Sequence, residues 1–288
     1  MAQSPRAAKM KHTVWNKQLI FGLVVLGLMI VAALGAPWLA RHDPLEQDLM
    51  SSFFSPIWKA DNDANFFLGT DSLGRDTWSR LLHGARVALL VAFVAALLAG
   101  LLGTALGLAA GYFGGKVDSV ISRLVEIWMS FPPVLLSIVL AAVIGPGLMT
   151  VIVAIVVIDW TRFCRVVRAE TMVQRELDYV TSAVTIGMTP LNILRSEILP
   201  NVAPLLLVLF SMEMGIAIVV EAILSFVGLS VATGAATWGG MIAEGRQYVN
   251  QAWWLMALPM ICIIVSVLGM NALGDGLKRV LDPLGVRG

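Results

Sequence analysis

Charged side chains are scarce in this 288-residue sequence, in which Asp, Glu, Lys and Arg make up only 14% against 58% hydrophobic residues. Soluble domains average about 25% charged residues. The composition therefore excludes an ordinary soluble domain and predicts a chain whose solvent is the lipid bilayer. A net charge of +1 also provides no strongly basic surface, so no nucleic-acid partner is expected.

Cysteine and histidine are equally rare. Cys164 and Cys262 lie in or beside apolar segments, which argues against a disulfide framework. The three histidines, His12, His42 and His83, are far apart, and the sequence contains neither an HExxH motif nor a Cys/His cluster. Neither a metal site nor a hydrolase site is predicted.

A phosphate-binding loop is missing as well. Such a loop reads Gly, four residues, Gly-Lys and then Ser or Thr. Here Gly115-Lys116 is followed by Val117, and Ala110 occupies the position of the first Gly. We therefore expect no catalytic residue and no cofactor in this chain, and Lys116 is interpreted as a positive anchor at a membrane surface.

Long apolar runs are what the sequence has in abundance. A helix needs about 20 apolar residues to cross the hydrocarbon core of a bilayer. Six segments reach this length, although two of them carry acidic residues: 19–39, 87–111, 127–147, 148–168, 202–231 and 253–274. The sequence thus predicts an all-α polytopic membrane protein with six transmembrane helices.

The distribution of Lys and Arg orients these spans, because both residues accumulate on the cytoplasmic side. Most of the 20 basic residues fall inside if residues 1–18 form a basic cytoplasmic N-terminus and residues 277–288 a cytoplasmic C-terminus. The first span, 19–39, then leads to an extracytoplasmic loop at 40–85 and a membrane core at 86–276. A cleaved signal peptide is an alternative for the first span, but its apolar run exceeds the roughly 7–15 residues of a signal core.

The cytoplasmic loop 169–200 contains the start and stop residues of two short helices. The first, Glu176 to Ile186, ends at Gly187, a residue suited to a left-handed helix C-terminus. Thr189 can cap the second helix, and Pro190 stands at its first position, where a missing N–H costs nothing. Leu191, Leu194 and Ile198 would form an apolar stripe, and Pro200 would open the fifth span. The loop is thus interpreted as a compact handle for a moving partner; a merely solvated linker is the alternative.

Two outer segments are also distinctive. Residues Asp76 to Leu82 predict a short amphipathic helix along the outer membrane surface. Asp71, Arg75, Asp76 and Arg80 are candidates for docking or gating contacts, although Asp71 and Asp76 could simply cap helix starts. The Gly-rich stretch 237–246 indicates a re-entrant or pore-lining turn.

Inserting an acidic residue into a span costs about 2.5–3.5 kcal/mol on insertion scales. Such residues therefore tend to face a water-filled path or a partner. Asp159, Glu213 and Glu221 are therefore candidates for the translocation path. Helical spacing through Ala217 places Glu213 and Glu221 on one side. For Asp159, an intrahelical ion pair with Arg162 is the favoured alternative.

Several of these residues carry a family resemblance. Thr181-Ser182-Ala183, Gly187 and Leu199-Pro200 resemble the coupling-loop signature of ABC-importer permeases, with Thr181 and Ser182 where Glu and Ala are usual. Further stretches are similar to the C-type subunit of the dipeptide, oligopeptide and nickel permease branch. They are Leu68 to Asp76, Ser79 to Leu82, Gly84 to Arg86, Ala110 to Gly115, Glu221 to Leu229, Asn271 to Leu277 and Asp282-Pro283.

The resemblance implies a type I ABC-importer permease fold in a bacterial inner membrane. It also implies a pore shared with a second, B-type permease, two cytoplasmic ATPase subunits that bind ATP and Mg, and an extracytoplasmic solute-binding protein. The cargo would be a di- or oligopeptide or a related small solute. The residues expected to couple to the ATPases are Thr181, Ser182, Ala183, Gly187, Met188, Thr189, Pro190, Leu191 and Pro200. The alternative is a stand-alone, proton-coupled secondary transporter that uses the buried acids as proton sites.

Overall fold

The computed structural model describes residues 16–59, 62–230 and 235–281. Throughout this part of the chain the regular elements are helices, accompanied by two isolated β-bridges, which confirms the all-α prediction. Residues 1–15 of the predicted cytoplasmic N-terminus and 282–288 of the predicted cytoplasmic C-terminus lie outside the described residues, as do 60–61 and 231–234.

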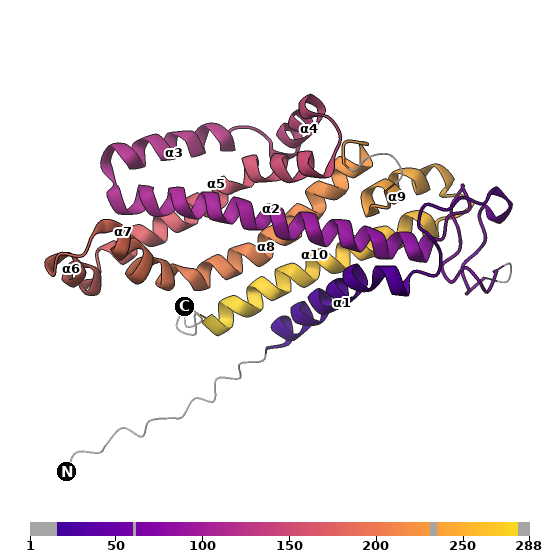
Figure 1. Cartoon of the computed structure of the whole chain (residues 1–288), viewed down its shortest axis with the longest axis horizontal. Coiled ribbons are helices and arrows are strands. Elements are labelled where there is room, and N and C mark those ends of the chain that lie inside the picture. The colour runs from indigo at the N-terminus through magenta and orange to yellow at the C-terminus, as the bar shows by residue number, and fades with distance from the viewer. Residues whose placement is uncertain (1–15, 60–61, 231–234, 282–288) are drawn as a thin grey trace, which may run out of the picture.

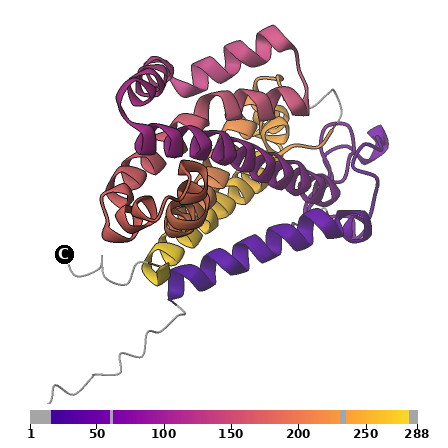
Figure 2. The same cartoon turned by 60° about the vertical axis from the view of Figure 1, so that its left-hand side comes forward.

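Five long helices form an elongated bundle (Figure 1). They are α1 (Lys17–Leu39), α2 (Thr77–Phe113), α5 (Leu148–Arg175), α8 (Leu199–Phe226) and α10 (Trp254–Leu281). Shorter elements join them: α3 (Gly115–Met129), α4 (Pro133–Ile144), α6 (Asp178–Thr185), α7 (Pro190–Asn192), a π-helical turn (Ile193–Ile198) and α9 (Trp238–Gly245). Two views of the bundle place α1 and the α3–α4 pair on opposite sides of it (Figures 1 and 2).

Four of the described helices are long and apolar enough to cross a membrane: α1, α2, the continuous helix from Pro190 to Phe226, and α10. The pair α3 and α4 makes a fifth if the two are counted as one broken span. Helix α5 has sufficient length, but its charged residues from Asp159 onward remove it from this set. The span count of six therefore stays a prediction.

The third predicted span, 127–147, is not a single straight helix. Helix α3 ends at Met129, α4 begins at Pro133, and the two are bent by 86° at the break. The physical reason is the Phe131-Pro132-Pro133 sequence, because a residue that precedes proline is steered away from the helical conformation. The apolar run marks the segment as membrane-compatible, but the two prolines divide it.

Residues 76–82 also differ from the sequence prediction of a separate surface helix. They are the N-cap and first turns of α2, which continues without interruption to Phe113. The Asp76 carboxylate accepts a hydrogen bond from the Ser79 N–H, and no proline follows to stop the helix. Arg80 and Leu81, which lie within this stretch, are both buried within the bundle.

Small residues let the helices approach closely. Gly103, Gly107 and Gly111 recur at intervals of four along α2 and face α5. A Cβ atom on Gly103 would lie 2.3 Å from the Trp160 carbonyl oxygen, and one on Gly107 would lie 2.7 Å from that of Cys164. No larger residue fits there. In a bilayer, such backbone proximity is a main source of helix association, because lipid tails remove the hydrophobic driving force.

The start of α1 and the end of α10 lie side by side, since Asn16 Nδ2 donates a hydrogen bond to the Gly276 carbonyl oxygen at 3.2 Å. Both lie toward the same end of the bundle as α6 and α7, whereas α9 and the loop after α1 lie at the other end (Figure 1). The cytoplasmic placement of the terminal segments and of the loop 169–200 stays a prediction.

The contact between α1 and α10 generates a stability prediction. A Cβ on Gly22 would lie 2.5 Å from the Leu273 backbone nitrogen, whereas a Cβ on Gly27, in the same helix, meets nothing within 4 Å. We expect Gly22→Val to lower the free energy of unfolding by about 1–3 kcal/mol through overpacking. Thermal unfolding of the detergent-solubilised protein, followed by size-exclusion chromatography, measures this. Gly27→Val is the matched control, and equal unfolding temperatures for the two variants would contradict the packing argument.

Candidate functional site

The segment from α6 to the start of α8, residues 178–200, lies at one end of the bundle, and we call it the handle. Gly187 has φ +83°, so it supplies the left-handed turn that ends the first helix, as predicted. Thr189 caps the next helix by accepting a hydrogen bond from the Asn192 N–H at 3.4 Å, and Pro190 occupies its first position. The helix end predicted at Gly187 and the helix start predicted at Thr189 and Pro190 are therefore confirmed.

The second predicted short helix is not a separate element. From Pro190 the chain continues through the π-helical turn Ile193–Ile198 directly into α8. Pro200 has no N–H, and its ring would crowd the carbonyl one turn earlier, which accounts for the widened turn before it. The backbone from Leu191 into α8 is therefore continuous.

The handle is fastened to the bundle by its own apolar cluster. The members of this cluster are Val167, Val180, Ala183, Ile193, Ile198 and Val202. Tyr179 adds a polar link, because its hydroxyl donates to Gln174 Oε1 at 2.6 Å and accepts from Asn201 Nδ2 at 3.3 Å. Burial raises the pKa of the Tyr179 phenol, which keeps this hydroxyl protonated as a donor.

Apolar side chains also remain uncovered at the tip of the handle. Ile186 is 79% exposed and Leu191 is 73% exposed. Of the predicted stripe, only Leu191 is exposed; Leu194 is partly buried and Ile198 is fully buried. Thr181, Ser182, Thr189 and Pro200 are exposed, whereas Ala183 is buried and Met188 is intermediate. The tip thus presents an apolar surface on a fixed base.

A cluster of ion pairs closes the opposite end of the bundle. Arg75 Nε lies 2.7 Å from Asp71 Oδ2, and Arg80 forms a second ion pair with the same carboxylate. Glu244 of α9 joins both guanidinium groups, with Oε2 at 2.7 Å from Arg75 Nη2 and 2.8 Å from Arg80 Nη1. Two acids and two guanidinium groups balance in charge, and they tie the outer loop and α2 to α9.

Sequence reasoning selected Asp71, Arg75, Asp76 and Arg80 but missed Glu244. Its sequence separation from Arg75 is 169 residues, and the signal available was a single acid within the Gly-rich outer stretch. Asp76 stands apart from the quartet, because its Oδ2 accepts from the N–H and the hydroxyl of Ser79 at 3.0 and 2.6 Å. Its geometry is that of a helix cap, the alternative considered for it.

The three buried acids divide into two groups. Asp159 Oδ1 lies 3.5 Å from Arg162 Nε, as the sequence predicts, and Arg162 Nη1 lies 4.0 Å from Glu213 Oε2 on α8. Glu221 is also buried, but its Oε1 accepts a hydrogen bond from the Ser230 hydroxyl at 3.0 Å. The structure therefore brings Asp159 and Glu213 together around one guanidinium and leaves Glu221 with a different partner.

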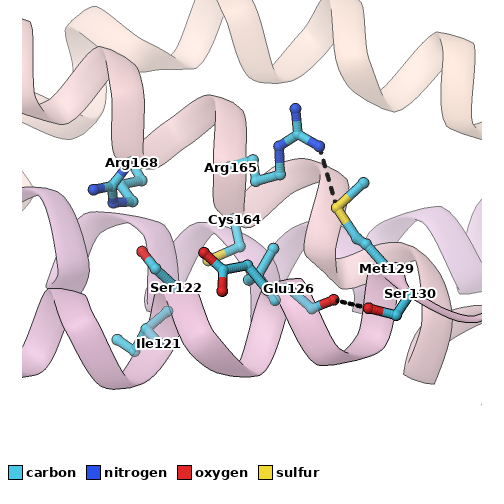
Figure 3. A pocket seen from close by; sticks show the side chains of 9 residues that line it. Ile121, Ser122, Glu126, Met129, Ser130, Cys164, Arg165 and Arg168 are labelled. Atoms are coloured by element: carbon cyan, nitrogen blue, oxygen red, sulfur yellow. Dashed lines mark hydrogen bonds between the residues drawn. The ribbon is translucent and has the colours of Figure 1, made fainter.

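Two cavities flank the bend between α3 and α4. The first, of about 300 Å³, is lined by the start of α4 and by α5, α8 and α10, and includes Asp159 and Arg162. The second, of about 600 Å³, lies between α3 and α5 (Figure 3). There Arg165 Nη1 contacts Met129 Sδ at 3.2 Å, and Arg168 Nη2 lies 2.7 Å from Asp118 Oδ2. Helix α5 thus contributes polar groups to both cavities.

A metal centre finds no support within residues 16–59, 62–230 and 235–281, where no group of three His, Cys, Asp or Glu side chains is arranged to hold an ion. The charged side chains at the outer end and beside the cavities can act through electrostatic attraction. They can hold an element in place at the outer end and face a polar ligand in the cavities beside α5.

The outer cluster generates a graded prediction. Removing one member of a buried ion pair costs about 3–5 kcal/mol. Asp71→Asn should lower local stability most, because its side chain is 6% exposed and serves both guanidinium groups. Glu244→Gln should cost less, about 1–2 kcal/mol, because its side chain is 44% exposed and solvent screens it. Glu46→Gln, on the exposed surface of the same loop, is the control and should change nothing.

Hydrogen exchange of residues 62–82 in the detergent-solubilised protein measures the effect. The order of exchange rates should be Asp71→Asn above Glu244→Gln above Glu46→Gln. Identical protection in all three variants would mean that the cluster does not hold the outer loop.

Comparison with known proteins agrees with these features. Residues 103–284 match the family model described as a binding-protein-dependent transport system inner membrane component, and residues 14–56 match the N-terminal TM domain of oligopeptide transport permease C. The chain is 38% identical to the di/tripeptide transport system permease protein DppC of Pseudomonas aeruginosa, covering 93% of this chain and 88% of that protein. It is 35% identical to the dipeptide transport system permease protein DppC of Bacillus subtilis, covering 93% and 82%.

Among solved structures, a permease chain of the MetNI methionine ABC transporter in an inward-facing conformation has the same fold. It superposes with a TM-score of 0.57 at 21% identity, covering 70% of this chain and 96% of that one. The family match over most of the chain and the extended identity to C-type relatives lead to one conclusion. This chain belongs to the binding-protein-dependent family of ABC-importer inner-membrane permeases, within its C-type peptide-permease branch.

Proposed function

We propose that this permease subunit forms one half of a peptide-conducting pore in a bacterial inner membrane. Its pore partner is a second, B-type permease, and its energy comes from two cytoplasmic ATPase subunits that bind ATP and Mg. An extracytoplasmic solute-binding protein delivers the cargo. The chain itself carries out no chemistry. The peptide cargo is supported by the names of the relatives in Pseudomonas aeruginosa and Bacillus subtilis.

The observation that carries this proposal is the exposed apolar tip of the handle. Ile186 directly follows α6 and Leu191 lies in α7, both in the loop 169–200 that we expect on the cytoplasmic side, and both side chains are exposed. Two exposed apolar side chains close together on a fastened element support a protein interaction site there. The cluster around Ile193 and Ile198 fixes this tip to α5 and α8, so movement of a docked partner would tilt both helices.

Movement of the tip reaches the membrane core through a single helix. The backbone from Pro190 to Phe226 carries the exposed Leu191 at one end and the cavity residues Gly215 and Ile216 further along. A rigid helix displaced at one end shifts its distal residues in the same step. This geometry supports coupling between nucleotide hydrolysis in a partner and the opening of a path beside α8.

Reconstitution tests the proposed assembly. Proteoliposomes that contain this chain, the B-type permease, both ATPases and the binding protein should accumulate labelled dialanine only when ATP is supplied. Vesicles with this chain alone should accumulate none, with or without a proton gradient. Gradient-driven uptake by the single chain would establish the secondary transporter instead.

Site-directed crosslinking tests the handle. A cysteine at Ile186 should crosslink to an ATPase subunit in the assembled importer, because its side chain projects from the tip. A cysteine at Met50, which is 89% exposed on the opposite end, is the matched control and should give no such product. If both positions gave the same yield, or if neither crosslinked, the handle would not be the docking site.

A further inference from the structure

Asp159, Arg162 and Glu213 form a group of three charges whose geometry is incomplete. Both acids have side chains that are 4% exposed, whereas that of Arg162 is 40% exposed. The guanidinium lies 3.5 Å from Asp159 and 4.0 Å from Glu213. Charge-assisted hydrogen bonds are shorter, at about 2.7–2.9 Å. One cation is therefore shared between two carboxylates without a close bond to either.

The charge in this group is also unbalanced. Two carboxylates face one guanidinium, and Glu213 Oε1 is a buried oxygen with no hydrogen-bond partner among the described residues. An unpaired charge buried away from water is costly, so such groups are paired in native structures. The outer quartet shows that balance, with two acids and two guanidinium groups. The inner group has two acids for one guanidinium.

A cavity of about 300 Å³ lies beside this group. Asp159 and Arg162 lie on its wall from α5, and Asn271 faces it from α10. The rest of the wall is apolar or small, and Gly215 leaves space next to the Asn271 amide. An apolar cavity with a few convergent polar groups is the usual form of a small-molecule site.

We infer that Asp159, supported by Glu213, binds the α-ammonium group of a peptide during its passage through the permease. This inference rests on the proposed peptide cargo. The ammonium group would approach Asp159 from the cavity and neutralise it. Arg162 would then be released to pair closely with Glu213, so that two cations balance two carboxylates. The carbonyl oxygen of Asn271 is placed to accept a further hydrogen bond from the ammonium group.

The test compares peptides with a free and a blocked amine. The importer complex is purified in nanodiscs without its binding protein and titrated at pH 7 with dialanine and with N-acetyl-dialanine, using isothermal calorimetry. Loss of one charge-assisted hydrogen bond corresponds to about tenfold or more in affinity. We expect dialanine to bind at least tenfold more tightly than the acetylated peptide.

Variants then test whether Asp159 and Glu213 cause the preference for the free amine. Asp159→Asn should abolish the preference while leaving the affinity for N-acetyl-dialanine unchanged, which shows that the cavity is intact. Glu213→Gln should reduce the preference in part, because Asp159 would remain paired with Arg162. Glu170→Gln is the matched control. It lies on the same helix α5, outside the cavity lining, and bonds to Gln174, so it should retain the full preference.

Equal affinities of the wild-type complex for the two peptides would overturn the inference, and so would a preference that survives Asp159→Asn. A proton held between the acids, without amine selectivity, is one way to reach the first result. The uptake assay separates the two proposals. Normal dialanine uptake without amine preference would leave the peptide permease standing and remove only the subsite, whereas absence of dialanine uptake would remove both.

Discussion

The close contact between α2 and α5 is the interaction on which the membrane core depends. Lipid offers helices no hydrophobic reason to associate, so association requires backbones that approach closely. Gly103 and Gly107 provide that approach to Trp160 and Cys164. With α5 held in this rotation, its Arg162 lies near Glu213 of α8 and its Arg168 pairs with Asp118 of α3. One row of glycines therefore positions charged groups on two sides of the helix.

The charged groups are compensated differently at the two levels of the bundle. At the outer end, Asp71 and Glu244 are matched by two guanidinium groups, and the cluster holds the outer loop against α9. Around Asp159 and Glu213, a single guanidinium serves two acids beside a cavity. A balanced cluster is stable without a ligand, whereas an unbalanced one gains from a cation. The difference separates a structural closure from the site that we propose for the ammonium group.

Much of the local structure could be predicted from the sequence. The Gly187 turn, the Thr189 cap and the Pro190 start follow from backbone preferences that act within a few residues, and the ion pair between Asp159 and Arg162 follows from helical spacing. The separate surface helix at 76–82 was wrong, and the span predicted at 127–147 is broken at its two prolines. In both places a local feature changed the helix boundaries. The Asp76 carboxylate starts α2 ten residues before the apolar run, and Pro132 and Pro133 divide the run at 127–147.

The sequence by itself determined that the chain is helical, apolar enough for a bilayer and punctuated at one loop, because composition and local backbone preference act without long-range partners. Only the tertiary structure decided that Glu244 joins Arg75 and Arg80, that Arg162 is shared with Glu213, and that Ile198 is buried while Leu191 is exposed. Each of these outcomes depends on which distant helix lies opposite a side chain. That choice is made by the packing of whole helices, and spacing along the chain does not encode it.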